Sequence, residues 1–168
     1  MDKQKKCVFS GTFDPPTLGH KQIIESARAI FDEIVIAVMV NPQKTPTFTF
    51  TQRKEMLELV CGNLQGVKII QFGGTVAELL QKENTQFYVR GIRNTVDFEY
   101  ENSNYFATKK LNKDVVPVYL PCPQELLHVS SSMVKNSLKF NTPIDEYVTK
   151  EVKAYIQAAV KNGEKSGL

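Results

Sequence analysis

Residues 10–20, Ser-Gly-Thr-Phe-Asp-Pro-Pro-Thr-Leu-Gly-His, hold the side chains best suited to chemistry in this chain. A short apolar run precedes them, and Gly19 and His20 open a segment with helical spacing. Backbone N–H groups at a helix start lack intrahelical partners and attract anions, and the helix dipole strengthens that attraction. His20 would add an imidazole donor there, and Gly19 would let a ligand approach the backbone. The stretch therefore predicts phosphate or nucleotide binding rather than an ordinary turn.

Basic and hydroxyl side chains follow three of the other predicted strands. Lys44 comes after the second strand, Arg90 and Arg93 come after the fourth, and serines 130–132 follow the fifth at a predicted helix start. The carboxyl ends of parallel strands meet at one edge of an open sheet, where ligands bind. Because the same loops carry few acidic residues, we expect a crevice there that holds a polyanion.

Apolar runs alternate with helical patterns along the whole chain. Strands are predicted at 7–10, 33–40, 67–72, 87–89 and 115–120. Helices are predicted at 19–31, from about 51, from Thr75, at 97–111, after 130–132 and at 148–162. Such alternation favours right-handed crossovers. We therefore predict the α/β class, with residues 1–168 as a single Rossmann-like domain. It would hold a five-stranded parallel sheet with helices on both faces and a helical C-terminal segment.

Composition limits the possible partners and compartment. A net charge of +3 is too small to favour nucleic acid as a partner, and no apolar run approaches the length of a membrane span. Cys7, Cys61 and Cys122 are odd in number and widely spaced, so we expect free thiols rather than disulfides or a metal site. The chain is expected to be a cytoplasmic protein.

The motifs of several nucleotide enzymes are missing from the sequence. No Gly-x-Gly-x-x-Gly follows the first strand and no Gly-x-x-x-x-Gly-Lys-Ser/Thr occurs, which argues against a dinucleotide oxidoreductase and a P-loop kinase. Residues for nucleophilic or paired-carboxylate catalysis are not identifiable either. The remaining donors suit attack by a ready-made phosphate on the α-phosphorus of a nucleoside triphosphate. A phosphate monoester, with a second pKa of about 6, needs no general base.

At this point the motifs resemble a known family. Thr17-Leu-Gly-His20 is similar to the (T/H)-x-G-H signature of the nucleotidylyltransferase superfamily, and Val129-Ser-Ser-Ser-Met-Val-Lys135 is similar to its second signature. The order and spacing of five segments resemble those of the bacterial phosphopantetheine adenylyltransferases. These are Gly11-Thr-Phe-Asp-Pro15, Asn41-Pro-Gln-Lys44, Val89-Arg-Gly-Ile-Arg93, Asp97-Phe-Glu-Tyr-Glu101 and Ser130–Lys135. The resemblance covers about residues 7–155, the core of a single nucleotidylyltransferase domain.

The resemblance implies transfer of the adenylyl group of ATP to 4′-phosphopantetheine, giving dephospho-coenzyme A and pyrophosphate, the penultimate step of coenzyme A synthesis. It implies a catalytic set of His20, Lys44 and Arg93, in which His20 stabilises the pentacovalent transition state. ATP contacts are implied for Thr12, Phe13, His20, Gly91, Ile92, Arg93, Glu101, Leu126, Leu127, His128, Val129, Ser130, Ser131 and Ser132. Contacts with the acceptor are implied for Thr12, Lys44, Val76 and Arg90.

The same resemblance implies Mg²⁺ held mainly by the ATP phosphates, with no dedicated metal ligands in the protein. It also implies a homohexamer and suggests feedback by coenzyme A. Residue patterns alone determine neither property, nor the order of substrate binding. The chain departs from the family pattern at Ser10, where proline is usual, and at Pro16 and Leu18. Leu126-Leu-His128 replaces an aromatic stretch beside the adenine, which puts nucleotide affinity in question.

Other functions remain open on the residues alone. Nicotinamide mononucleotide adenylyltransferases and glycerol-phosphate cytidylyltransferases share the histidine signature. A nucleotide-binding regulatory module without catalysis would also keep the anion-binding loops. Release of pyrophosphate with each candidate acceptor separates these possibilities.

Overall fold

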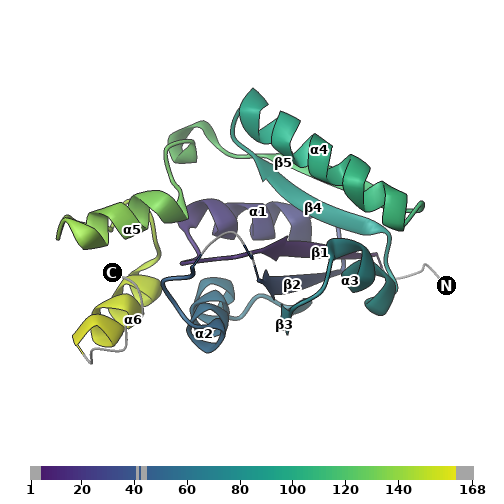
Figure 1. Cartoon of the computed structure of the whole chain (residues 1–168). Helices are drawn as coiled ribbons and strands as arrows, with labels where there is room; N and C mark the ends of the chain where they lie inside the picture. The colour runs from purple at the N-terminus through teal and green to yellow at the C-terminus, as the bar shows by residue number, and fades with distance from the viewer. Residues whose placement is uncertain (1–4, 41, 43–44, 162–168) are drawn as a thin grey trace.

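The computed structural model describes residues 5–40, 42 and 45–161. These residues form a five-stranded sheet in the order β3-β2-β1-β4-β5, and every neighbouring pair is parallel (Figure 1). The strands are β1 (Lys6–Gly11), β2 (Glu33–Met39), β3 (Val67–Phe72), β4 (Phe87–Ile92) and β5 (Val116–Pro121). The predicted α/β class and parallel sheet are therefore confirmed.

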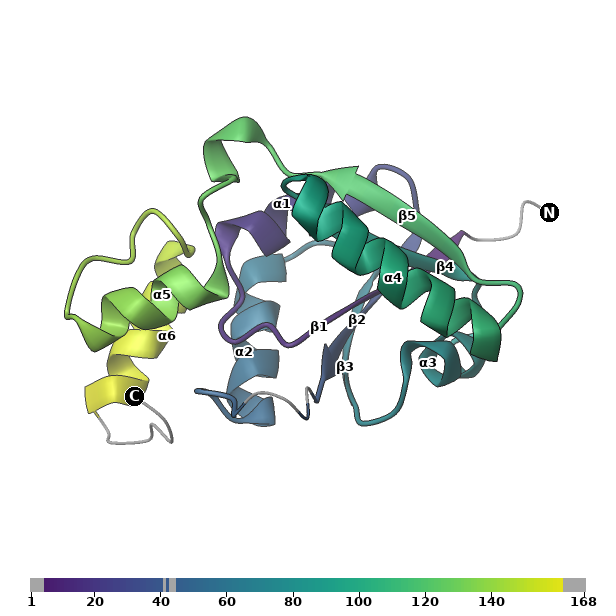
Figure 2. The same cartoon turned by 45° about the horizontal axis from the view of Figure 1, so that its top comes forward.

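Helices cover both faces of the sheet, as predicted (Figure 1). Helices α1 (Leu18–Arg28) and α2 (Phe50–Cys61) lie on one face, and α3 (Val76–Lys82) and α4 (Thr95–Leu111) lie on the other. A short 3-10 turn, η1 (Gln124–Leu126), leads to α5 (Ser131–Lys139) and α6 (Lys150–Lys161). Both views place α5 and α6 beyond the carboxyl edge of the sheet (Figures 1 and 2).

Side-chain caps explain where several helices begin. Thr17, Thr49 and Thr75 each accept a backbone N–H from the residue three positions on, and that residue's side chain accepts the cap's own N–H. Such a capping box satisfies two donors that a helix start would otherwise leave free. The box predicted at Thr75 is confirmed, and Ser130 caps α5 in the same way through its hydroxyl alone.

The two faces differ in how they are packed. The larger apolar cluster joins β1 and β2 to α1, α2 and α6 through residues such as Phe9, Ile24, Ile36 and Met56. The smaller cluster, which includes Tyr88, lies on the other face under α3. None of the residues of α4, all of which the structure describes, is buried. The face under α1 and α2 therefore supplies most of the apolar burial that stabilises the fold.

Strand β4 is longer than the sequence indicated. The prediction ended it at Val89, but pairing with β5 continues from Arg90 opposite Tyr119 to Ile92 opposite Pro121. Arg90, Gly91 and Ile92 therefore lie on the strand and not in a loop after it. A glycine inside a strand weakens the hydrophobic pattern from which strands are predicted. In the structure, a Cβ on Gly91 would come within 2.8 Å of Ile23 on α1. The helix packs against the strand at this point because the side chain is missing.

The order of the strands sets where a ligand binds. From β1 the chain proceeds outward through β2 and β3, then returns to the other side of β1 for β4 and β5. Loops leaving the carboxyl ends of β1 and β4 therefore diverge and leave a crevice between them. Within the described residues, no helix is long and apolar enough to cross a membrane.

Candidate active site

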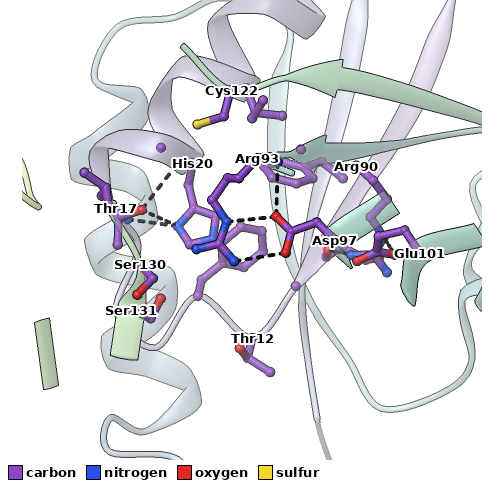
Figure 3. A pocket seen from close by; sticks show the side chains of 18 of the residues that line it. Thr12, Thr17, His20, Arg90, Arg93, Asp97, Glu101, Cys122, Ser130 and Ser131 are labelled. Atoms are coloured by element: carbon purple, nitrogen blue, oxygen red, sulfur yellow. Dashed lines mark hydrogen bonds and ion pairs between the residues drawn. The ribbon is translucent and has the colours of Figure 1, made fainter. Parts of the chain in front are cut away.

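A cavity of about 360 Å³ occupies the crevice between β1 and β4. Its walls come from the loop after β1, the start of α1, the end of β4, the first turns of α4 and the start of α5 (Figure 3). Many of the residues singled out in the sequence line it together. They are Thr12, Phe13, His20, Arg90, Gly91, Arg93, Glu101, Val129, Ser130, Ser131 and Ser132.

The structure places the other described candidates outside this cavity. Ile92 and the segment 126–128 do not line this cavity, and the ring of His128 lies 6.0 Å from that of Tyr147. Val76 lines a second cavity of about 270 Å³ between α3 and α4, which Arg90 also lines. Lys44 lies outside the described residues.

His20 is held by the cap of its own helix. The backbone N–H of Thr17 donates to Nδ1 of His20 at 3.0 Å, and the Thr17 hydroxyl lies at the same distance from that nitrogen (Figure 3). A ring nitrogen that accepts a backbone N–H carries no proton. The proton of the neutral ring is therefore on Nε2, the only ring nitrogen left to donate to a ligand.

Apolar neighbours keep this imidazole uncharged. The Phe13 ring packs edge-on against it at 5.0 Å, and Phe9 lies behind at 6.3 Å. Burial lowers the pKa of His20 from 6.5 to about 4, and the positive charge of Arg93 lowers it in the same direction. The ring is thus a neutral hydrogen-bond donor at neutral pH.

The loop after β1 adopts an unusual backbone to build this environment. Phe13 has a φ of 47°, in the left-handed region that side chains other than glycine rarely adopt, and its ring is buried. A Cβ on Gly11 would come within 3.1 Å of that ring. Gly11 therefore leaves room for the ring to turn under the loop, and the loop can follow the edge of the cavity.

Both arginines of β4 and its following loop are paired with carboxylates from α4. Arg93 makes two contacts with Asp97, at 2.9 and 3.2 Å, and its backbone N–H donates to the same carboxylate at 3.1 Å. Arg90 places Nε 3.1 Å from a carboxylate oxygen of Glu101 and donates from its guanidinium to the Ser10 carbonyl. The loops after the strands carry few acidic residues, as the sequence indicated, but these cations are nevertheless paired. The prediction considered only the loops after the strands, whereas helix α4 supplies the carboxylates.

The start of α5 reaches the cavity from the far side. The Ser130 hydroxyl caps the helix by accepting the N–H of Met133, and the Ser131 hydroxyl donates to the Pro15 carbonyl at 2.7 Å. That second bond joins α5 to the loop after β1. Residues at the starts of two helices, α1 and α5, thus line one cavity.

Sequence reasoning missed two buried charged residues behind the site. Arg53 on α2 donates to the Thr12 carbonyl at 2.8 Å, and Asp14 accepts the N–H groups of Thr47 and Phe48, each at 2.9 Å. Asp14 therefore holds the loop that follows β2. The sequence carried a signal for Arg53, because it shares the helical spacing of the buried Met56. A charged side chain at a position expected to be apolar indicates a specific polar partner.

The carboxylates around the cavity already have cationic or backbone partners. Within the part of the chain that the structure describes, no three His, Cys, Asp or Glu residues gather as a metal site would require. Cys7, Cys61 and Cys122 are free thiols, as predicted. Burial raises the pKa of Cys7 to about 12 and that of Cys61 to about 11, so both stay protonated at neutral pH.

Comparisons with known proteins agree with this donor set. A family model described as cytidylyltransferase-like matches residues 8–137, which defines the chain as a nucleotidyltransferase. Phosphopantetheine adenylyltransferase from Thermotoga neapolitana is 35% identical over 94% of this chain and 98% of its own length. The protein of that name from Natranaerobius thermophilus is 32% identical over 90% of this chain and 94% of its own length. The chain belongs to the phosphopantetheine adenylyltransferase family.

The same fold occurs in a solved structure with little sequence identity to this chain. Nicotinic acid mononucleotide adenylyltransferase from Plasmodium falciparum, solved in complex with NaAD, superposes with a TM-score of 0.68. The match covers 95% of this chain and 98% of that one at 16% sequence identity. The two proteins therefore share an architecture, and the likeness extends no further than that.

Proposed function

We propose that this protein transfers the adenylyl group of ATP to 4′-phosphopantetheine, giving dephospho-coenzyme A and pyrophosphate. The observation that carries the proposal is the family membership over nearly the whole chain. The site supports it, because one neutral imidazole and two fixed guanidinium groups line one cavity with two helix starts. We further infer that residues 1–168 act as one nucleotidylyltransferase domain.

The reaction needs no base from the protein. A phosphate oxygen of the acceptor attacks the α-phosphorus of ATP, the bond from that phosphorus to the bridging oxygen breaks, and pyrophosphate leaves with the electron pair. Nε2–H of His20 would donate to an oxygen of the α-phosphoryl group, where negative charge grows in the transition state. Arg93 and the N–H groups at the start of α5 would hold the other phosphates in line.

The acceptor is assigned to the β4 and α3 side of the crevice. Arg90 would bind its phosphate together with Lys44, and its arm would extend into the second cavity beside Val76. That cavity opens next to Arg90, so one molecule could place its phosphate in the crevice and its arm between α3 and α4. We expect Lys44→Ala to raise KM for phosphopantetheine more than KM for ATP. The opposite ranking would mean that the two subsites are exchanged.

Mg²⁺ is proposed as the cofactor, bound mainly through the ATP phosphates. The donor set fits this arrangement, because the neighbouring carboxylates Asp97 and Glu101 are engaged by arginines and Mg²⁺ needs few protein ligands. The metal would neutralise charge on the departing pyrophosphate, while the chain's own cations and helix starts bind the phosphates. EDTA should abolish turnover, and added Mg²⁺ should restore it. Full activity in EDTA would remove the metal from the reaction.

The decisive experiment measures pyrophosphate release from purified protein with ATP and Mg²⁺. Phosphopantetheine should support turnover, and dephosphorylated pantetheine should not, because it lacks the attacking phosphate. Nicotinamide mononucleotide, and glycerol phosphate with CTP, test the two related activities. Turnover with either of those alone would replace the proposed acceptor, and no turnover with any pair would favour a regulatory module.

Assembly, regulation and compartment belong to the same proposal. We infer a homohexamer, supported by the exposed apolar side chains of Val96, Phe106 and Leu111 on α4, and light scattering would measure its mass. Coenzyme A is inferred to inhibit by feedback, because it carries both the pantetheine arm and the adenylyl group of the product. The three free thiols fit a cytoplasmic protein.

A further inference from the structure

Arg53 on α2 is a buried cation, with only 3% of its surface exposed. Nη1 donates to the Thr12 carbonyl at 2.8 Å and lies 3.5 Å from the Met39 carbonyl, while Nε donates to the Thr49 carbonyl at 3.4 Å. The guanidinium also lies over the Phe50 ring, 4.6 Å from its centroid. Arg53 therefore joins the loop after β1, the end of β2 and the start of α2 through their backbone carbonyls.

Packing alone does not account for a charge at this position. Burial lowers the pKa of Arg53 and the negative charge of Asp14 raises it, yet an arginine stays protonated at neutral pH. An apolar side chain would fill the same space without removing a charge from water. What the arginine adds is a planar set of N–H groups that hold carbonyls in fixed directions.

The carbonyl that Arg53 binds most closely belongs to the peptide unit that leads into Phe13. The Thr12 carbonyl and the Phe13 nitrogen lie in one plane, so a bond to that carbonyl restrains φ of Phe13. On the other side of Phe13, the Asp14 carboxylate accepts the N–H groups of Thr47 and Phe48. Phe13 thus lies between two anchored residues. Its φ of 47° is in a region that such a side chain keeps only where the surrounding structure holds it.

The conformation of Phe13 matters because its buried ring packs against His20, edge-on at 5.0 Å. Thr12 and His20 line the same cavity (Figure 3). The charged and titratable groups that share this cavity with the imidazole come from β4, α4 and the residue after β5, and they are Arg90, Arg93, Asp97, Glu101 and Cys122. On the histidine's own helix, Lys21 and Glu25 pair with each other at 3.8 Å. In the described part of the chain none of these side chains hydrogen-bonds to Arg53, so a substitution there leaves them in place.

We propose that Arg53 is a positioning residue: by holding the Thr12 carbonyl, it keeps the Phe13 ring against His20 and so keeps the imidazole an uncharged, fixed donor. The inference rests on the proposed function for the part that His20 plays in the reaction. The link from Arg53 through Phe13 to His20 is a property of the free protein and can be measured without substrate.

The first measurement is the pKa of His20 by NMR titration. Every variant also carries His128→Gln, so that one of the two histidine signals remains. In that background the pKa should be about 4. Arg53→Lys should raise it toward 6.5 by about one unit, because Phe13 moves and water reaches the ring. Lysine keeps the positive charge, so this shift reports lost geometry and not a lost charge.

A matched control lies at the next position of the same helix. Lys54 has a side chain that is 41% exposed, and Lys54→Met should leave the pKa of His20 at the background value. Arg53→Met removes the N–H groups altogether and should raise the pKa further than Arg53→Lys does. It should also lower kcat by about 10- to 100-fold, since the donor is no longer held in line. A merely structural role would lower the free energy of unfolding without moving this pKa.

A double variant tests whether Arg53 acts through Phe13. Phe13→Ala removes the ring directly and should raise the pKa of His20 by itself. Adding Arg53→Lys to Phe13→Ala should then cause no further rise, because the ring through which Arg53 acts is gone. This comparison does not need Arg53→Met, so it stays decisive if that variant does not fold.

Two outcomes would overturn the inference. One is a pKa of His20 that stays near 4 in the Arg53 variants, and the other is a double variant whose shifts simply add. Turnover of the wild type with ATP and phosphopantetheine, measured separately, tests the proposed function. If the wild type turns over and the pKa does not move, only the role of Arg53 is wrong. If the pKa moves as expected and no turnover occurs, the link to His20 stands and the proposed function is wrong.

Discussion

The two faces of the central sheet are built for different purposes. Beneath α1, α2 and α6, apolar side chains such as Phe9 and Ile36 fill the space between helix and strand. Across the sheet, α4 buries none of its described residues, and its Asp97 and Glu101 pair with Arg93 and Arg90. One face therefore secures the fold, and the other holds ionic groups near a cavity.

The reacting groups follow the same division. His20 belongs to the apolar face, where Phe9 and Phe13 keep its ring neutral. Arg90 belongs to the ionic face, where a carboxylate offsets its charge. A donor that must stay uncharged benefits from an apolar environment, and a cation that must stay oriented benefits from a counter-ion. The crevice at the edge of the sheet is where the two kinds of group can act on one ligand.

The largest expected effect is on the stability of the apolar face. Ile36→Ala should lower the free energy of unfolding by about 2–5 kcal/mol, because it leaves a cavity in a fully buried cluster. Ile30→Ala makes the same change at a side chain that is 48% exposed and serves as the matched control. Urea unfolding measures both. Equal losses at the two positions would mean that burial does not distinguish them.

A loss of catalysis should follow removal of the neutral donor. His20→Ala should lower kcat by about 10² to 10³, since it removes one donor to charge that develops in the transition state. KM for either substrate should change much less. Steady-state kinetics with each substrate in turn gives both values, and near wild-type kcat would exclude His20 from the mechanism.

A smaller effect links the same histidine to pH. The folded state lowers the pKa of His20 to about 4 from 6.5, so between those values the unfolded chain binds more protons. Stability should therefore fall as pH is lowered from 6.5 toward 4, and this group should add no further loss below 4. His20→Gln should remove that part of the slope, while His128→Gln should retain it. A slope that survives His20→Gln would assign it to other groups.

The smallest effect on stability is expected on α4. Phe106 is 56% exposed, so Phe106→Ser should change the unfolding free energy of the isolated chain by no more than about 0.5 kcal/mol. If α4 lies between subunits, the same change should lower the mass measured by light scattering. A large loss of stability at a concentration where the chain is monomeric would contradict this prediction. It would show that Phe106 on α4 is packed more firmly than its exposure indicates.

Local sequence rules were sufficient for much of the fold. The β-branched run of β2 and the capping box at Thr75 each depend on neighbours within a few positions, and both were predicted. Strand β4 was predicted too short, because Gly91 interrupts the apolar run. Its place in the strand depends on pairing with β5 and on the approach of Ile23 from α1.

By itself, the sequence determined the alternation of strands and helices, the parallel sheet, and therefore the edge at which His20, Arg93 and the serines of α5 would meet. These follow from periodicity and from the handedness of crossovers, which act locally or by chain order. Only the tertiary structure decided which charges pair. Glu101 is eleven positions from Arg90, and Asp14 holds a loop more than thirty positions away. Which charged groups pair depends on which of them are desolvated together in the folded chain, and their spacing along the sequence does not indicate this.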